Sequence, residues 1–376
     1  MTAADNLGTG PAAATERAVS RLAELVGHET PSGYAAGLHA CYDLLTAWAP
    51  AALGRPHRLV REEVPHLFWP KRSGAPGGVL LLCHADTVWP LGTLAERPFA
   101  RQNGRLTGPG AFDMKAGLVI GWEALALAAD SGGLEHVSVL VTGDEETGSP
   151  TSRALVESAA ADCAAVLVLE PGEGDAAKVA RKGVGLYRIA VQGRASHAGL
   201  EPEAGVNALI ELAGQVLVVA GLGDDGAGTT VTPTVATAGT TTNTVPEAAA
   251  FNVDVRAWQL TELQRVDAAL RALAPRHPEA RLEVSGGINR APLEQAMSAD
   301  LLDLARKVSR DRGLPSLGAA RVGGGSDGNF TAGLGIPTLD GLGPRGAGAH
   351  ARHEWVAEQS LLERAALVAG LIEALR

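Results

Sequence analysis

The sequence has few cysteines, few aromatic residues and no long apolar run. Its three cysteines, Cys41, Cys83 and Cys163, form no closely spaced pair, so reduced thiols of a cytoplasmic protein are expected rather than a disulfide framework. Aromatic residues make up only 4% of the chain, which argues against a surface that stacks on bases or sugars. No apolar run reaches the length of a membrane span, and residues 1–14 form a polar tail unlike a signal peptide.

Basic residues are in the minority. The 32 lysines and arginines against 42 acidic residues give a net charge of −10, which argues against nucleic acid or an anionic membrane as partner, because both require a basic face. The length of 376 residues, with 46% hydrophobic and 20% charged residues, indicates a globular chain of more than one domain. Small polar or charged molecules remain as substrates.

Short apolar runs alternate with helical patterns in the first half of the chain. The runs predict strands over 78–83, 137–142, 164–169 and, more weakly, 336–340, and the periodicity predicts helices over 15–26, 38–48, 116–129 and 152–160. Strands that are continuously apolar, rather than alternating, are typical of a parallel sheet covered on both sides. We therefore expect an α/β domain with a largely parallel sheet and helices on both faces.

The pattern changes between residues 184 and 291. Strands are predicted over 184–193, 229–238, 248–258 and 281–285, and helices over 206–222 and 261–273. This β-α-β-β-α-β order is that of a split βαβ sandwich, and it is expected to form an inserted α+β lid. Residues 15–183 and 292–376 would then build the first domain, to which the last segment contributes a helix, a strand and a helix.

Metal-binding side chains follow several of the predicted strands. His84 and Asp86 follow the first, Glu145 and Glu146 follow the second, and Glu170 follows the third. In an open parallel sheet, ligands bind beyond the carboxyl ends of the strands, so these side chains are expected to meet in one crevice. Two further candidates lie in Gly-rich segments, Asp113 ahead of a helix and His350 late in the chain.

This set of imidazoles and carboxylates predicts a metal site. Oxygen and nitrogen ligands without thiolate suit Zn²⁺, with Mn²⁺ or Co²⁺ as alternatives, and five such groups are too many for one tetrahedral ion. Two divalent ions, three carboxylates and one bridging hydroxide would sum to a neutral centre. Ions roughly 3.5 to 4 Å apart can generate hydroxide near neutral pH and polarise a carbonyl, so amide or ester hydrolysis is predicted.

Six motifs of the chain resemble those of the dinuclear zinc peptidase/aminoacylase family, which includes carboxypeptidase G, acetylornithine deacetylase, succinyl-diaminopimelate desuccinylase and aminoacylase. The motifs are His84-Ala85-Asp86, Gly108 to Asp113 with Lys115 and Gly117, Gly143 to Gly148, Leu169-Glu170-Pro171, Ser196 to Gly199, and His350. Their order and spacing cover nearly the whole chain beyond the N-terminal tail. The motifs are most similar to those of the carboxypeptidase G-like branch. The fold that this resemblance implies is the zinc exopeptidase type with a lid.

The resemblance implies a role for each residue of the crevice. Asp113 would bridge two metal ions, with His84 and Glu170 on one ion and Glu146 and His350 on the other. Asp86 would orient the ligand His84, because a histidine held in one tautomer is a better ligand. Glu145 would act as general base on the metal-bridging hydroxide or its parent water. The peptide bond between Asp113 and Met114 is expected to be cis, as it often is in such proteins.

The resemblance also implies roles for residues outside the crevice. His197 of the lid would stabilise the oxyanion, in its own site or in that of a partner, which predicts a homodimer formed through the lid. Asn243, Arg256 and Arg290 would receive the carboxylate of the substrate, a task that suits the planar guanidinium. Lys178, in the expected loop after Glu170, would contact a second acidic group. Gly324 lies in a Gly-rich loop whose amides would approach the bound carboxylate.

Several alternatives stay open. Release of C-terminal glutamate is the first substrate hypothesis, with N-acyl-amino-acid deacylase or dipeptidase activity as the alternative and a non-catalytic metal-dependent binding protein as the alternative of another class. His353 competes with His350 as a ligand, and Arg256 can instead neutralise Asp254. Residues 323–328 match G-x-G-x-x-G, but they lack the following acid and the βαβ context of a dinucleotide site.

Overall fold

The computed structural model describes residues 10–376, which divide into two compact units. The first unit runs to Ala180 and resumes with Gln295–Val322 and Ser326–Arg376; the second consists of Arg181–Glu294 with Gly323–Gly325. Residues 1–9 of the expected N-terminal tail lie outside the described residues. The first helix, α1 (Pro11–Val26), begins earlier than predicted, with a proline at the position where its missing N–H costs nothing.

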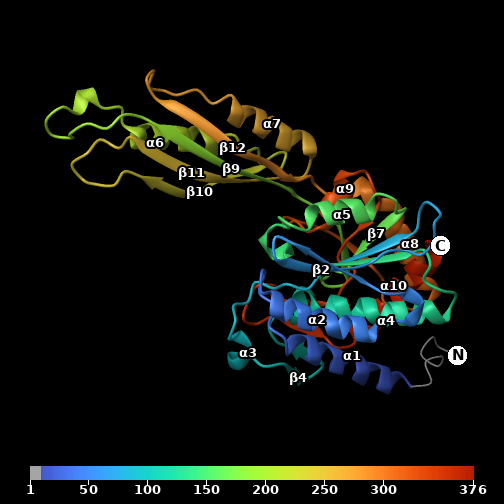
Figure 1. The fold of residues 1–376 in the computed structure, drawn as a ribbon. Coiled ribbons are helices and arrows are strands. Elements are labelled where there is room, and N and C mark those ends of the chain that lie inside the picture. Colours follow the sequence, from blue (N-terminus) through green and yellow to red (C-terminus); the bar gives the residue numbers. More distant parts are fainter. Residues whose placement is uncertain (1–9) are drawn as a thin grey trace. The chain divides into compact units, whose positions relative to one another are not determined.

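The first unit is built on a six-stranded sheet in the order β1-β2-β6-β3-β7-β14 (Figure 1). Four strands are parallel: β3 (Val79–His84), β6 (Val137–Thr142), β7 (Ala165–Val168) and β14 (Thr338–Leu339). The hairpin of β1 (His57–Arg61) and β2 (Val64–Trp69), which the sequence did not predict, joins the sheet antiparallel to β6. Every residue of β3 and β6 is buried, which explains their continuous hydrophobicity.

Helices cover both faces of this sheet, as predicted (Figure 1). Alternate side chains of β3 enter different cores: Leu81 and Cys83 face the larger one, whereas Leu80 and Leu82 face the smaller one. The larger core includes residues of α1, α2 (Ala35–Trp48), α4 (Ala116–Asp130), α8 (Ala299–Asp311) and α10 (Ser360–Ala374). The smaller core lies under α5 (Arg153–Ala160) and α9 (Gly328–Gly333).

The first unit has additional short elements that the sequence did not predict. A four-stranded sheet joins β15 (Gly346–Ala347), β16 (Trp355–Ala357), β5 (Arg105–Thr107) and β4 (Ala100–Gln102), and a second small sheet pairs β13 (Gly318–Val322) with β8 (Ala176–Arg181). A short helix, α3 (Thr93–Glu96), precedes β4. Residues 111–115 form an irregular helical turn in which the Asp113–Met114 peptide bond is cis, as expected.

The second unit is an antiparallel four-stranded sheet in the order β10-β11-β9-β12, with both of its helices packed against it. The strands are β9 (Gly183–Gln192), β10 (Thr230–Ala238), β11 (Ala248–Ala257) and β12 (Arg281–Arg290), and the helices are α6 (Ala208–Ala220) and α7 (Leu260–Arg271). The prediction ended β12 at 285 because two glycines follow. Gly286 instead continues the strand at φ 90°, where a Cβ would lie 2.1 Å from the Leu186 carbonyl oxygen.

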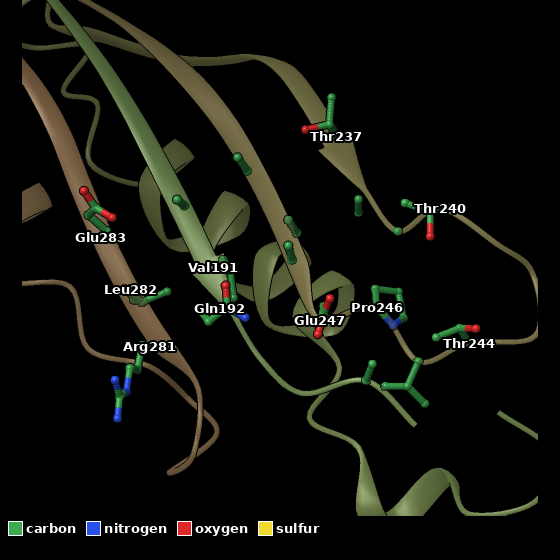
Figure 2. A pocket seen from close by; sticks show the side chains of 18 of the residues that line it. Val191, Gln192, Thr237, Thr240, Thr244, Pro246, Glu247, Arg281, Leu282 and Glu283 are labelled. Atoms are coloured by element: carbon green, nitrogen blue, oxygen red, sulfur yellow. The ribbon is translucent and has the colours of Figure 1, made fainter. Parts of the chain in front are cut away.

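A groove of about 670 Å³ opens on the second unit's sheet (Figure 2). Small side chains line part of it, among them Ala190, Ala238, Ala248 and Ala250. Arg281 and Glu283 project from β12 at one side, and Thr240 and Thr244 lie at the other side, on the connection between β10 and β11. The lining includes both charge signs, so the groove has no strong preference for an anion or a cation. No helix within residues 10–376 has both the length and the apolar character needed to cross a membrane.

Candidate metal centre

His84 is the last residue of β3, and its imidazole is oriented by the main chain. Its Nδ1 lies 2.9 Å from the main-chain oxygen of Asp86, an acceptor that fixes the proton on Nδ1. In the neutral ring Nε2 then carries the lone pair, and this atom lies 3.3 Å from Asp113 Oδ1 and 3.2 Å from Glu170 Oε1. The side chain is only 2% exposed, so these carboxylates face it in a largely dry site.

His350 faces the other oxygen of the same aspartate. Its Nε2 lies 3.3 Å from Asp113 Oδ2 and 3.1 Å from Glu146 Oε2. The residue has φ 63°, in the left-handed region that few non-glycine residues occupy. His350 and the competing candidate His353 are both exposed, but His350 is the imidazole that faces these carboxylates. The five candidate residues therefore form two groups that share Asp113.

The spacing of these atoms fits metal coordination. Two ligands about 2.0 to 2.1 Å from a tetrahedral ion lie about 3.3 to 3.4 Å from each other. The four N···O separations of 3.1 to 3.3 Å agree with that value and exceed the roughly 2.8 Å of a charge-assisted hydrogen bond. In addition, Glu146 Oε1 is buried without a hydrogen-bond partner. Donor spacing, donor chemistry and this unpaired oxygen all fit divalent ions.

The electrostatics of the centre favour positive charge. Burial opposes protonation of His84, but hydrogen bonds that the imidazole donates to the carboxylates of Asp113, Asp86 and Glu170 outweigh it and hold the pKa of His84 well above its usual range. Hydrogen bonds with Asp113 and Glu146 raise the pKa of His350 to about 10. Burial raises the pKa of the Glu146 carboxyl and so disfavours its charged form, whereas the charged form of both imidazoles is favoured. The negative potential that raises the pKa of both imidazoles would also stabilise a divalent cation.

Asp86 does more than the sequence predicted. Its carboxylate is 3.4 Å from His84 Nδ1, farther than its own main-chain oxygen, so the carbonyl is the principal orienting group. The carboxylate oxygens instead accept hydrogen bonds from the backbone N–H groups of Glu145 and Glu146, each at 3.1 Å, and from the Ser32 hydroxyl at 2.6 Å. Asp86 therefore fixes the turn that presents both glutamates.

Glu145 lies in the same centre as the two glutamates of the predicted ligand set. Its carboxylate belongs with His84 and Glu170 to a group whose ligand atoms all lie within 4.8 Å of one another. Neighbouring Glu146 belongs instead to a group with His84 and Asp113. The two adjacent side chains therefore occupy different positions in the crevice.

His197 and Asn243 both belong to the second unit. His197 is exposed, and its Nδ1 accepts hydrogen bonds from the backbone N–H groups of Gly199 and Leu200, both at 3.1 Å. The proton of the neutral ring is therefore on Nε2, which makes that atom a donor. The bridge between His197 and Thr244 brings the histidine next to the strand connection that contains Asn243, whose main-chain oxygen accepts from Ala198.

The arginine and lysine candidates differ in their surroundings. Arg256 donates hydrogen bonds to both oxygens of Asp254, at 2.7 and 2.8 Å. This pairing corresponds to the alternative in which Arg256 neutralises Asp254 in place of binding the substrate carboxylate. Arg290 is 5% exposed at the end of β12. Lys178 was expected in a loop, but it lies in β8, where its backbone bonds to Asp340. The error arose because the segment after Glu170 lacks an apolar pattern.

The Gly-rich loop with Gly324 groups with the second unit. Arg181 Nη1 donates to the main-chain oxygens of Gly324 and Gly325 at 3.1 and 3.2 Å. These two hydrogen bonds connect the loop to Arg181, the first residue of the second unit. The sequence had assigned residues 323–325 to the segment of the first domain.

Two positions that support the centre were not singled out from the sequence. Asp144 accepts hydrogen bonds from Thr151 N and Oγ1, both at 2.7 Å, and from Ser152, and so anchors the turn before Glu145. Glu354 is buried and bonds to the backbone just ahead of Asp113. Asp144 was visible as the first of three consecutive acids, whereas only the tertiary structure distinguishes Glu354 from an ordinary surface glutamate.

Comparisons with known proteins agree with this architecture. Residues 80–374 match the model of peptidase family M20/M25/M40. The chain is 33% identical over 306 residues to carboxypeptidase G2 from Pseudomonas sp. (strain RS-16), covering 78% of this chain and 73% of that protein. Among solved structures, aminopeptidase PepT from Bacillus cereus ATCC 10987 has a TM-score of 0.70 at 22% identity, with 96% and 98% of the two chains covered.

A second solved structure has the same fold. The M20 family metallo-carboxypeptidase Sso-CP2 from Sulfolobus solfataricus has a TM-score of 0.69 at 16% identity, with 95% of this chain and 98% of that chain covered. The two-unit α/β architecture and the crevice of imidazoles and carboxylates define a metallohydrolase. The chain belongs to peptidase family M20/M25/M40 and is a metallopeptidase that uses divalent metal.

Proposed function

We propose that the enzyme hydrolyses an amide bond next to a free carboxylate and releases a C-terminal amino acid, with glutamate as the leading candidate. The observation that supports the chemistry most strongly is the position of Asp113, whose two oxygens face two different histidines at 3.3 Å each. Similarity to carboxypeptidase G2 supports the choice of a C-terminal substrate. N-acyl-amino-acid deacylation or dipeptide hydrolysis is the alternative within the family.

In this proposal His84, Glu170 and Asp113 would hold one divalent ion, and His350, Glu146 and Asp113 would hold the second. Zn²⁺ suits these ligands, and Co²⁺ or Mn²⁺ can replace it. When bound, such a pair lowers the pKa of water and polarises the scissile carbonyl. Asp86 and Asp144 order the turn that bears Glu146, and the proposal keeps the neighbouring Glu145 out of the ligand set.

Glu145 is the proposed general base. Its carboxylate accepts a proton from the attacking water and returns it to the leaving nitrogen as the C–N bond breaks, so the proton balance closes within one turnover. The neighbouring Asp86 carboxylate fixes the backbone of Glu145 through a 3.1 Å hydrogen bond, which limits the positions that the side chain can adopt. An asparagine or glutamine could not accept and return the proton.

His197 is the proposed donor to the oxyanion. Because Nδ1 is occupied by two backbone N–H groups, the neutral imidazole presents its Nε2–H outward. A donor aimed at the developing negative charge stabilises the transition state more than the ground state. Asn243 and Arg290 are the proposed receivers of the free carboxylate, and Lys178 and Gly324 remain weaker candidates. Arg256 contributes only if it releases Asp254.

We also propose that two copies associate through the second unit. Helix α6 exposes four apolar side chains: Leu209 (46%), Ile210 (71%), Leu217 (74%) and Val218 (45%). Exposed apolar clusters of this kind typically mark interaction surfaces. Strand β10, at the edge of the same sheet, offers backbone groups beside α6.

A substrate panel tests the proposed function. Metal-stripped enzyme, reloaded with Zn²⁺, Co²⁺ or Mn²⁺, is assayed for amine release from N-acyl-glutamates, N-acyl-alanines, dipeptides and the C-terminal amide of each. We expect the acyl-glutamates to give the highest kcat/KM and the amides to be poor substrates. Equal hydrolysis of acids and amides would refute recognition of the carboxylate, and no hydrolysis of any substrate would favour the non-catalytic alternative.

A further inference from the structure

Glu354 is a buried acid that lies between the segments that bear two proposed ligands. Its side chain is 1% exposed, although it follows an exposed histidine and sits just ahead of β16. One oxygen accepts a hydrogen bond from Gly110 N at 2.8 Å, and the other accepts from Phe112 N at 3.4 Å. These backbone groups precede Asp113, so the carboxylate holds the segment that presents that residue.

The same glutamate belongs to the turn that presents His350. Within this turn, Ala351 N donates to the Gly348 carbonyl at 2.9 Å and Glu354 N donates to the Ala351 carbonyl at 3.0 Å. Gly348 has φ 85°, and a Cβ there would lie 2.9 Å from Glu354 Cα, so the turn is closed tightly on itself. Glu354 and His350 therefore move as one piece of backbone.

We propose that Glu354 is a positioning residue that ties the His350 turn to the Asp113 segment and so sets the geometry of the second metal site. The proposal rests on the proposed metal centre, where His350, Asp113 and Glu146 share an ion. Within residues 10–376, the Glu354 side chain bonds to the Asp113 segment and pairs with Arg97, but it does not bond to the segments that bear His84 and Glu170. Because Asp113 would contact both ions and His350 only the second, loss of Glu354 should weaken both ions and the second one more strongly.

Charge supports the same assignment. The nearest cation, Arg97, has Nη2 3.7 Å from Glu354 Oε1, and its guanidinium lies 4.5 Å from the Trp89 ring centroid. At that distance the arginine compensates the carboxylate only in part, and burial raises the pKa of Glu354 to about 7. If the fold required only one hydrogen-bond acceptor at position 354, the neutral amide of a glutamine would be sufficient. A carboxylate, with one oxygen for each backbone N–H, matches the two donors.

Titration of metal-stripped, full-length protein with Zn²⁺ against a chromophoric chelator tests the proposal. Glu354→Ala and Glu354→Gln are compared with the wild type, and His350→Ala identifies which step of the isotherm belongs to the second ion. Glu123→Gln is the matched control, because Glu123 is also 1% exposed but pairs with Arg17 and Arg21 on the helices. Thermal unfolding of each variant reports folding separately.

We expect Glu354→Ala to weaken the second ion by about 10- to 100-fold, the usual effect of removing a group that orients ligands, with a smaller loss at the first ion through the shared Asp113. Glu354→Gln, which keeps one acceptor, should give an intermediate loss, and Glu123→Gln should change neither affinity. Unchanged affinities, equal losses at both ions, or the same loss in Glu123→Gln would overturn the proposal. Failure of the zinc-loaded wild type to hydrolyse any amide would refute the proposed function but would leave this titration decisive.

Discussion

The adjacent glutamates Glu145 and Glu146 should respond to the same substitution in different ways. Both backbone N–H groups are held by Asp86 at 3.1 Å, so replacing either side chain with glutamine leaves the turn in place. Glu146 Oε2 faces His350 at 3.1 Å, whereas Glu145 lies outside the proposed ligand set. Glu145→Gln should therefore remove proton transfer alone, and Glu146→Gln should remove metal binding.

The magnitudes follow from these roles. Loss of a general base lowers kcat by about 10² to 10⁴, which corresponds to roughly 3 to 5 kcal/mol of transition-state stabilisation. Glu145→Gln should show this loss with KM within about threefold and with full metal content, because no ligand is lost. Glu146→Gln should bind the second ion at least about tenfold more weakly.

The assay combines steady-state amide hydrolysis with metal analysis of the same samples. Asp43→Asn, an exposed carboxylate paired with Arg58, controls for the loss of a surface charge and should leave both readouts unchanged. Full activity in Glu145→Gln would refute its role as base. Loss of metal in Glu145→Gln would instead show that it is a ligand and that the division between the two glutamates is wrong.

Three further predictions concern assembly and pH. Ile210→Glu or Leu217→Glu should shift the native mass from dimer to monomer in light scattering, whereas the exposed control Leu91→Glu should not; a wild-type monomer would contradict the association. If His197 acts in the partner's site, an equal mixture of Glu145→Gln and His197→Ala chains, refolded together, should recover about a quarter of the wild-type activity, and recovery of none would place His197 in its own site. Glu354, which faces Arg97 and the charge of Asp113, has a pKa raised by burial to about 7, so its ionisation costs folding stability increasingly as pH rises from about 4.5 to about 7. Metal-free Glu354→Gln should therefore gain stability over the wild type in urea at pH 8 but not at pH 4.5, and a difference independent of pH would contradict the buried charge.

The parallel sheet was predictable because its strands are buried on both faces and are therefore apolar throughout. Strands β3 and β6 illustrate this, since every residue in each is buried. The hairpin β1–β2 was missed because β1 is mostly exposed and its side chains show no apolar pattern. Short strands such as β15 depend on pairing with distant segments, which local patterns do not encode.

The convergence of His84, Glu146 and Glu170 followed from their positions after predicted strands, but the hydrogen bonds that hold them in place could not be predicted. The sequence placed His84, Glu146 and Glu170 in one crevice, and the structure brings them together. It did not indicate that the Asp86 main-chain oxygen, rather than its carboxylate, is the nearer partner of His84. Nor did it indicate that Glu354 bonds to the segment before Asp113, because that contact joins residues 242 to 244 positions apart.

The central claim is that Asp113 joins two metal sites, and metal stoichiometry tests it most directly. Wild-type protein dialysed against Zn²⁺ and analysed by mass spectrometry of the native chain should hold two ions per chain. His350→Ala and His84→Ala should each hold one, and Asp113→Ala should hold none tightly. Zero or one ion in the wild type, or two in Asp113→Ala, would contradict the account.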